Sequence, residues 1–314
     1  MRRRNMSLFW FWLCMALVIL VLIAGIASSL ISVWLRNVKP EASQTLRPVP
    51  ITTLSVQRTA PYAGLDITVI NAQYALYFVD DTTHPVPATV RLNVQIASHN
   101  NGPSKVAYYD SLHLLIPGSA SPVALNNTNL PTAGIQPGAK VTGWIDFAVP
   151  KGTQLDTLTL QIGSAITSES LVDIPMKAPF DASRYADKIY AQSSTFSFNW
   201  NGHVLLYHLT SIEVRYAYQG NQAKVGQQFY VFNFTVDNAN TSDVAPGSSF
   251  SYLRLAATGY NQPPIDSNLP NSFKAGSNNN TGQVAFAGPA NMHTFMLDFL
   301  SPNNNMPQTF NINI

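Results

Sequence analysis

The sequence is poor in cysteine and in charged residues, and both shortages limit what the protein can be. A single cysteine occurs among 314 residues, and this residue, Cys14, lies in a long apolar run near the N-terminus. The rest of the chain can therefore form neither disulfides nor a cysteine-ligated metal site. Charged residues make up 11% of the chain, against roughly 25% in an average soluble protein. Its polarity comes mainly from Asn, Ser, Thr and Gln.

A basic surface is also missing. The formal net charge is +2, from 18 basic and 16 acidic residues. Five of the basic residues flank the apolar run: Arg2, Arg3, Arg4, Arg36 and Lys39. Beyond them, 13 of the 18 basic residues remain against all 16 acidic ones, so the body carries a net negative charge. Nucleic-acid binding needs a basic face, and we therefore expect no nucleic-acid partner.

The apolar run predicts a membrane anchor. No charged residue occurs in residues 8–35, and about 20 apolar residues are enough to cross a bilayer core. Trp10 and Trp12 lie near one end of the run and Trp34 near the other, as expected for interfacial aromatic residues. Basic residues are denser before the run than after it, which puts residues 1–7 in the cytoplasm and the following chain outside. The alternative is a cleaved signal peptide and a secreted body.

Beyond the anchor the sequence predicts a stalk and then an all-β body. Residues 36–60 contain three prolines and little apolar alternation, which favours an extended stalk. Period-2 alternation follows, for example at residues 90–96 and 141–149, with Pro, Gly and Asn turns between the runs. A closing strand is expected from the alternation of Phe310, Ile312 and Ile314. Antiparallel β-sandwiches fit this pattern.

The second part of the body repeats the first at an offset of about 140 residues. Tyr74-Ala75 matches Tyr216-Ala217, Leu92-Asn93-Val94-Gln95-Ile96 matches Phe232-Asn233-Phe234-Thr235-Val236, Leu112-His113-Leu114 matches Leu253-Arg254-Leu255, and Ile145-Asp146-Phe147 matches Leu297-Asp298-Phe299. This order predicts two tandem copies of one β-sandwich at residues 61–165 and 196–314, joined by a linker over residues 166–195. A chance match between β-rich sequences is the alternative.

One stretch resembles a known family. An Asn-rich turn is followed by the motif Pro137-Gly138-Ala139-Lys140-Val141-Thr142-Gly143-Trp144-Ile145-Asp146-Phe147-Ala148-Val149-Pro150. It resembles a family of immunoglobulin-like extracellular domains of unknown function on bacterial lipoproteins and membrane-anchored proteins, whose fold is similar to that of a mycobacterial secreted immunoprotective protein. The resemblance covers residues 61–165 and, more loosely, 196–314, where the Pro-Gly…Gly start of this strand is absent. It implies an immunoglobulin-like fold and extracytoplasmic exposure, and it brings no catalytic residues.

The sequence contains no recognisable catalytic or metal-binding pattern. None of the six histidines forms a His-x-x-x-His or Glu-x-x-His pair, and no nucleophile elbow, phosphate-binding glycine loop or dinucleotide fingerprint occurs. We therefore expect no enzyme, no cofactor and no metal site. Asp80-Asp81 favours a solvated turn over a Ca²⁺ site, which needs six to eight oxygens. Asp146 and Asp298 are expected to face solvent, with a paired structural carboxylate as the alternative.

Aromatic residues are the remaining candidates for a partner-binding surface. Tyr216, Tyr218 and Tyr230 lie on two aromatic-rich strands of the second copy, and Trp144 lies on the outward face of its strand in the first. Such rings stack on sugars or anchor protein partners, although core packing explains the same alternation. The predicted function is a non-catalytic, membrane-anchored binding or adhesion protein with a protein or glycan partner. The alternatives are an accessory subunit of a membrane complex and, less favoured, an extracytoplasmic enzyme.

Overall fold

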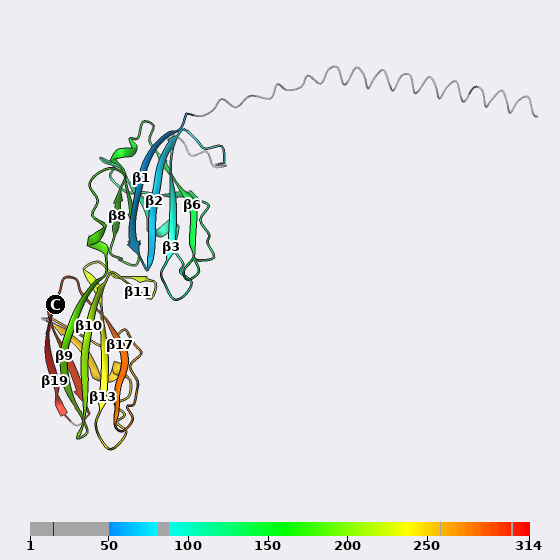
Figure 1. The fold of residues 1–314 in the computed structure, drawn as a ribbon. Coiled ribbons are helices and arrows are strands. Elements are labelled where there is room, and N and C mark those ends of the chain that lie inside the picture. Colours follow the sequence, from blue (N-terminus) through cyan, green and yellow to red (C-terminus); the bar gives the residue numbers. More distant parts are fainter. Residues whose placement is uncertain (1–14, 16–49, 81–87, 258, 303) are drawn as a thin grey trace, which may run out of the picture. The chain divides into compact units, whose positions relative to one another are not determined.

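The computed structural model describes residues 50–80, 88–257, 259–302 and 304–314, together with Met15 (Figure 1). The chain divides into two compact units, residues 1–48 and residues 49–314, and apart from Met15 the described residues belong to the second. The predicted cytoplasmic tail, the anchor at residues 8–35 and the first part of the predicted stalk therefore lie outside the described residues. Within the described part, no helix is long and apolar enough to cross a membrane.

The described chain is all-β, with 58% strand and 6% helix. Its strand pairs are antiparallel. The N-terminal half contains β1 (Thr52–Tyr62), β2 (Leu65–Ala75), β3 (Ala88–Ser98), α2 (Tyr108–Ser111), β4 (Leu112–Leu115), β5 (Val123–Thr128), β6 (Lys140–Val149), η1 (Leu155–Thr157), β7 (Thr159–Ile162), β8 (Val172–Pro175) and η2 (Ala182–Tyr185). The C-terminal half contains β9 (Lys188–Trp200), β10 (His203–Arg215), β11 (Ala217–Tyr218), β12 (Asn221–Gln222), β13 (Gln227–Asn238), α3 (Ser249–Tyr252), β14 (Leu253–Ala257), β15 (Tyr260–Gln262), β16 (Asp266–Ser267), β17 (Ser277–Pro289), β18 (Thr294–Ser301) and β19 (Asn304–Asn313).

All eight strands of the N-terminal half form one sheet, in the order β1-β2-β3-β6-β5-β4-β7-β8. Every one of these strands contributes to a single hydrophobic cluster. In β3, for instance, Val90, Leu92 and Val94 are buried in alternation with more polar neighbours, because successive side chains of a strand point to opposite faces. The strands predicted at residues 90–96 and 141–149 are thus confirmed as parts of β3 and β6.

The C-terminal half has its own hydrophobic cluster, which two sheets share. The larger sheet has the order β16-β17-β13-β10-β9 and the smaller β15-β14-β18-β19, while β11 and β12 form a separate hairpin. Aromatic rings dominate this core: the ring centre of Phe299 lies 5.0 Å from that of Phe198 and 4.9 Å from that of Tyr207. Ile312 of β19 is buried in the same cluster, so the predicted closing strand is confirmed.

Each half begins with a long two-stranded hairpin whose turn has only two residues (Figure 1). Ala63-Gly64 joins β1 to β2 and Asn201-Gly202 joins β9 to β10, and all four residues have positive φ angles. Positive φ at both central residues is the type I′ geometry, whose twist matches that of the paired strands. Glycine adopts it without a Cβ penalty and asparagine tolerates it.

Two predicted boundaries are wrong. The predicted stalk at residues 36–60 overlaps β1, which already begins at Thr52. This strand lies at the edge of its sheet and is half exposed at Leu54 and Val56, so its alternation is weak. The predicted linker at residues 166–195 contains β8, where Val172 and Ile174 are buried in the first cluster, and the beginning of β9. A strand of four residues is too short to show a period.

The two halves repeat a set of contacts around one motif. Thr128-Asn129-Leu130-Pro131 in the first half and Ser267-Asn268-Leu269-Pro270 in the second follow the same pattern. In each, the hydroxyl accepts a hydrogen bond from the leucine amide, over 3.1 Å and 3.2 Å. The Asn side-chain oxygen accepts one from the backbone of the neighbouring strand, at Trp144 of β6 (2.6 Å) and at Gln283 of β17 (2.5 Å).

This repetition identifies β17 as the equivalent of β6. β6 pairs with β3, and β17 pairs with β13 in the corresponding place. The predicted match of Ile145-Asp146-Phe147 with Leu297-Asp298-Phe299 is therefore wrong, since the latter lies in β18, which pairs with β14 and β19. Gly143 and Gly282 instead occupy the same position in the two strands, and each lies close to the leucine of the repeated motif, Leu130 or Leu269.

Candidate functional site

The two halves of residues 49–314 meet at a junction made largely by backbone hydrogen bonds. Ser170 N donates to the carbonyl of Ala223 over 2.7 Å, and Val225 N donates to the carbonyl of Ser168 over 2.8 Å. The amide of Ala63, in the first hairpin turn, donates to Oε1 of Gln222 over 2.9 Å. The hairpin β11–β12 is thus held against the segment that precedes β8.

Two adjoining cavities lie along this junction, and together we call them the junction groove. The first, the polar arm, has a volume of about 680 Å³ and is lined by the 99–104 loop, by Arg215, Tyr218 and Gln219, and by residues of β16 and β17. The second, the aromatic arm, has a volume of about 620 Å³. His99, Asn100, Arg215 and Gln219 line both cavities, so the two arms lie next to each other.

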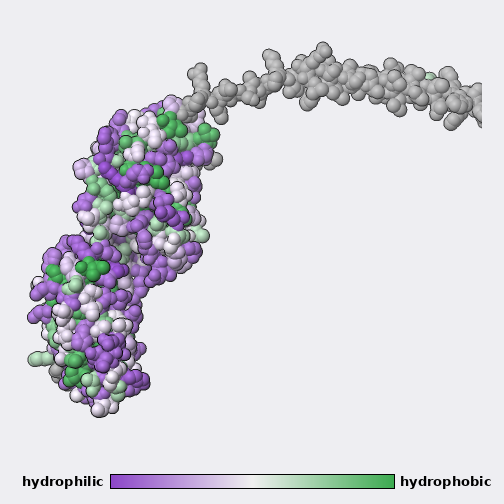
Figure 2. All heavy atoms as spheres, viewed as in Figure 1, coloured by the Kyte–Doolittle hydropathy of each residue, from purple (hydrophilic) through white to green (hydrophobic). Residues whose placement is uncertain are grey.

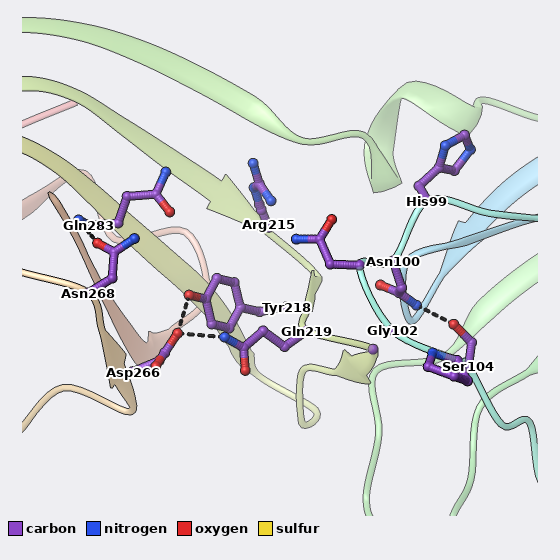
Figure 3. Close-up of a pocket in the computed structure, with 13 residues that line it drawn as sticks. His99, Asn100, Gly102, Ser104, Arg215, Tyr218, Gln219, Asp266, Asn268 and Gln283 are labelled. Carbon is purple, nitrogen blue, oxygen red and sulfur yellow. Dashed lines mark hydrogen bonds between the residues drawn. The ribbon is translucent and has the colours of Figure 1, made fainter. Parts of the chain in front are cut away.

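The polar arm is organised around the carboxylate of Asp266 (Figure 3). The hydroxyl of Tyr218 donates to Oδ2 of Asp266 over 2.7 Å, and Nε2 of Gln219 donates to the same oxygen over 2.5 Å. Burial, together with the hydrogen bond to Asp266, raises the pKa of Tyr218 to about 12. Its hydroxyl therefore stays protonated at neutral pH. On the opposite side, Nδ2 of Asn100 donates to the hydroxyl of Ser104 over 2.7 Å.

The aromatic arm is lined by Pro61, Leu65, Tyr185 and Tyr216, beside polar groups of the junction. Tyr185 is buried, whereas Tyr216 is half buried, and their ring centres lie 6.5 Å apart in an edge-to-face arrangement. Edge-to-face packing is favourable between aromatic rings, so it fixes the orientation of the more accessible ring of Tyr216.

Apart from Asp266, the charged groups of the groove lie close to other titratable groups. Nε2 of His99 lies 2.8 Å from a carboxylate oxygen of Asp66. Arg215 forms ion pairs with Glu213 and, over 3.4 Å, with Asp187. Nε of Arg215 is buried and has no hydrogen-bond partner in the described part of the protein. The groove therefore offers directed hydrogen-bonding groups without an accessible cluster of one charge.

The predicted site residues have separate locations. Tyr216 lines the aromatic arm and Tyr218 the polar arm, so two of the four come together at the junction groove. Tyr230 does not, since its side chain is fully buried and its hydroxyl donates to the carbonyl of Pro289 over 2.6 Å. It belongs to the core of the C-terminal half, and its prediction as a partner-binding residue is wrong because the alternation of β13 places it on the inner face.

Trp144 belongs to a structural cluster on β3 and β6, away from the lining of the groove. The guanidinium of Arg91 lies 4.1 Å from the ring centre of Trp144 and 4.1 Å from that of Phe78. The same guanidinium donates to both oxygens of Asp146, each over 2.8 Å, and its NH1 donates to Asp80 over 2.9 Å. Cation–π contacts of this kind stabilise a protein most when they are shielded from water.

The expectation that Asp146 and Asp298 face solvent is wrong. Asp146 is completely buried and Asp298 is 7% exposed. Asp146 lies directly opposite Arg91 in the pairing of β3 with β6, which supplies the compensating charge. Asp298 accepts a hydrogen bond from the hydroxyl of Thr309 over 2.6 Å. Asp80 lies in a turn with its side chain 55% exposed, as predicted, and it also contacts Arg91; Asp81 lies outside the described residues.

Sequence reasoning missed the groove residues of the loops. Asn100, Gln219, Asp266 and Asn268 carry no local pattern of function, because loops show no period. One signal was nevertheless present: Asn268 belongs to the Ser/Thr-Asn-Leu-Pro motif, which recurs in the sequence at Thr128-Asn129-Leu130-Pro131. A search for that repeat would have marked the segment before β17 as a fixed structural element.

The surface is largely polar on the face that Figure 2 displays, and its apolar residues occur in small separate groups. Within residues 50–80 and 88–314, leaving out 258 and 303, no group of three His, Cys, Asp or Glu side chains could hold a metal ion. The best-formed arrangement of polar groups that we find is therefore the junction groove.

Comparisons with known proteins add little. No protein-family model matches the sequence, and no curated protein matches it significantly. Among solved structures, the crystal structure of a functionally unknown protein from Listeria monocytogenes EGD-e is similar to part of the chain, at 12% identity and a TM-score of 0.29. The similarity covers 41% of this chain and 88% of that one. A TM-score this low supports no argument on fold or function.

Proposed function

We propose that the chain is a membrane-anchored binding protein, exposed outside the cytoplasm, that holds a ligand in the junction groove and catalyses no reaction. The single observation that carries the proposal is the groove itself, where side chains of both halves surround two adjoining cavities. Their volumes fall in the range of about 300–1,000 Å³ that is typical of ligand sites. The uncharged residues 8–35, with denser basic residues before them, support the anchor and the outward orientation.

The proposal includes the fold of the two halves. We assign them to two tandem immunoglobulin-like β-sandwiches that arose by duplication. The support is a shared order of elements: a long first hairpin, a further long strand (β3 or β13), and a one-turn helix (α2 or α3) that leads directly into the next strand. The repeated hydrogen bonds of Asn129 and Asn268 add to it. Two such domains with a ligand between them form a rigid support whose loops and strand ends converge on one groove.

The proposal is tested by photo-crosslinking in intact cells that make the protein naturally. Gln219 is replaced by p-benzoylphenylalanine in the full chain, with its anchor present. Gln161 provides the matched control, because its Nε2 also donates to an aspartate, Asp173, over 3.1 Å, but it lies outside the groove lining. We expect one dominant ultraviolet-dependent adduct from position 219 and none from position 161.

Equal labelling at both positions, or no adduct at position 219, would contradict binding in the groove. External protease supplies the second readout, since it should digest the body in intact cells while leaving the N-terminal segment protected. A body that resists protease until the cells are lysed would contradict the proposed orientation.

A further inference from the structure

The lining of the junction groove also indicates the chemistry of its ligand. We infer that the groove binds a neutral oligosaccharide. This inference rests on the proposed function, because it assumes that the groove is the binding site.

Side-chain amides dominate the polar arm. Its lining includes Asn100, Asn101, Gln219, Asn268 and Gln283, which approach from both halves of the body (Figure 3). Each amide carries both a donor and an acceptor. Sugar hydroxyl groups are also donors and acceptors at once, so amides match them better than groups of a single kind. The hydrogen bond from Gln219 to Asp266 orients one of these amides in advance of binding, which lowers the entropy cost of ordering it.

The charges of the groove disfavour an acidic ligand. The lining of the two arms includes the carboxylates of Asp66, Asp187 and Asp266, but Arg215 is its only permanently charged cation among the described residues. Arg215 is already paired with Glu213 and Asp187. A phosphate, sulfate or uronate group would therefore meet net negative charge and no free cation, so binding it would require costly desolvation without a compensating ion pair.

The aromatic arm supplies the apolar contact that sugar rings need. Tyr216 lines this arm and Tyr218 the neighbouring one, and both side chains are half buried with rings that remain partly accessible. Tyr216 is held by Tyr185, and Tyr218 packs on Phe229 with ring centres 5.9 Å apart. Rigid tyrosine rings beside directed polar groups give contact area at low entropic cost. Two adjoining arms suit an oligosaccharide better than a single sugar.

The inference is tested with the full-length chain in lipid nanodiscs on an array of neutral and acidic glycans. Chitohexaose, cellohexaose and mannohexaose serve as neutral probes for titration calorimetry, with hyaluronan and heparin hexasaccharides as acidic ones. We expect binding of at least one neutral glycan and of no acidic one. Gln219→Ala and Tyr216→Ala should each weaken that binding about tenfold or more.

Matched controls separate binding from folding. Gln161→Ala removes a comparable amide–aspartate contact outside the groove, and Tyr109→Ala removes an exposed tyrosine that lines neither arm; both should leave the affinity unchanged. The inference is overturned if only acidic glycans bind, if no neutral glycan on the array binds, or if the groove variants bind as well as the controls. If position 219 still crosslinks a protein while no neutral glycan binds, the sugar inference fails and the proposed function stands. Absence of any adduct at position 219 would refute the proposed function itself.

Discussion

Replacing Arg91 by Met should destabilise the N-terminal half by about 3–5 kcal/mol, the usual cost of removing one partner of a buried ion pair. Asp146 is completely buried and Arg91 is 7% exposed. Two parallel hydrogen bonds of 2.8 Å join the guanidinium to this carboxylate. Methionine keeps much of the aliphatic volume between Phe78 and Trp144 but removes the guanidinium charge that compensates the buried carboxylate of Asp146.

Asp80 gives the internal comparison. It also accepts from Arg91 over 2.9 Å, but its side chain is 55% exposed. Water solvates an exposed carboxylate in the folded protein, and such pairs contribute about 0–1 kcal/mol. Asp80→Asn should therefore cost less than about 1 kcal/mol, although the N–O distances of the two ion pairs are nearly the same.

Urea unfolding followed by tryptophan fluorescence and far-ultraviolet circular dichroism measures these differences. The double variant Arg91→Met/Asp146→Leu removes both charges, so its stability should return to within about 1–2 kcal/mol of the original. The reasoning is refuted if Arg91→Met costs less than about 1 kcal/mol. It is equally refuted if the double variant is as unstable as Arg91→Met alone, since the loss would then come from packing rather than from removing the compensating charge of Arg91.

Three further predictions concern single sites. Thr89 is fully buried and its hydroxyl has no hydrogen-bond partner in the described structure, so Thr89→Val should stabilise the protein by about 1 kcal/mol in urea titrations; a destabilised variant would reveal a hidden partner. A Cβ at Gly282 would lie 2.6 Å from Cδ2 and 2.8 Å from Cα of Leu269, so Gly282→Ala should lower stability by about 1–3 kcal/mol, whereas Gly102→Ala meets no atom within 4 Å and should be nearly neutral. Burial raises the pKa of Tyr230 to about 12, while the unfolded value is near 10. The contribution of Tyr230 to the free energy of unfolding is therefore unchanged below pH about 10. It falls by roughly 1.4 kcal/mol per pH unit up to about pH 12, because in that range this tyrosine ionises only in the unfolded chain. Alkaline unfolding curves should become shallower in Tyr230→Phe, and identical curves would contradict this.

Strand prediction succeeded where apolar and polar residues alternate strictly in the sequence. Val90, Leu92 and Val94 alternate with polar residues in β3, and that period is a property of the extended backbone itself. The sequence pattern did not predict β1 and β8 as strands, because β1 is half exposed and β8 has only four residues. It also failed to match β6 with β17, because β-rich motifs such as Ile-Asp-Phe and Leu-Asp-Phe look alike on strands that occupy different places in their sheets.

The sequence by itself determined the all-β character of the described body, the alternating faces of its longer strands and the placement of Tyr216 and Tyr218 among candidate binding residues. Only the tertiary structure decided that Asp146 is an internal partner of Arg91, because strand register brings together residues far apart in the chain. The junction groove likewise depends on loops around Asn100, Gln219 and Asp266. Periodicity follows from neighbouring peptide units, whereas the meeting of distant loops follows from how completed sheets pack.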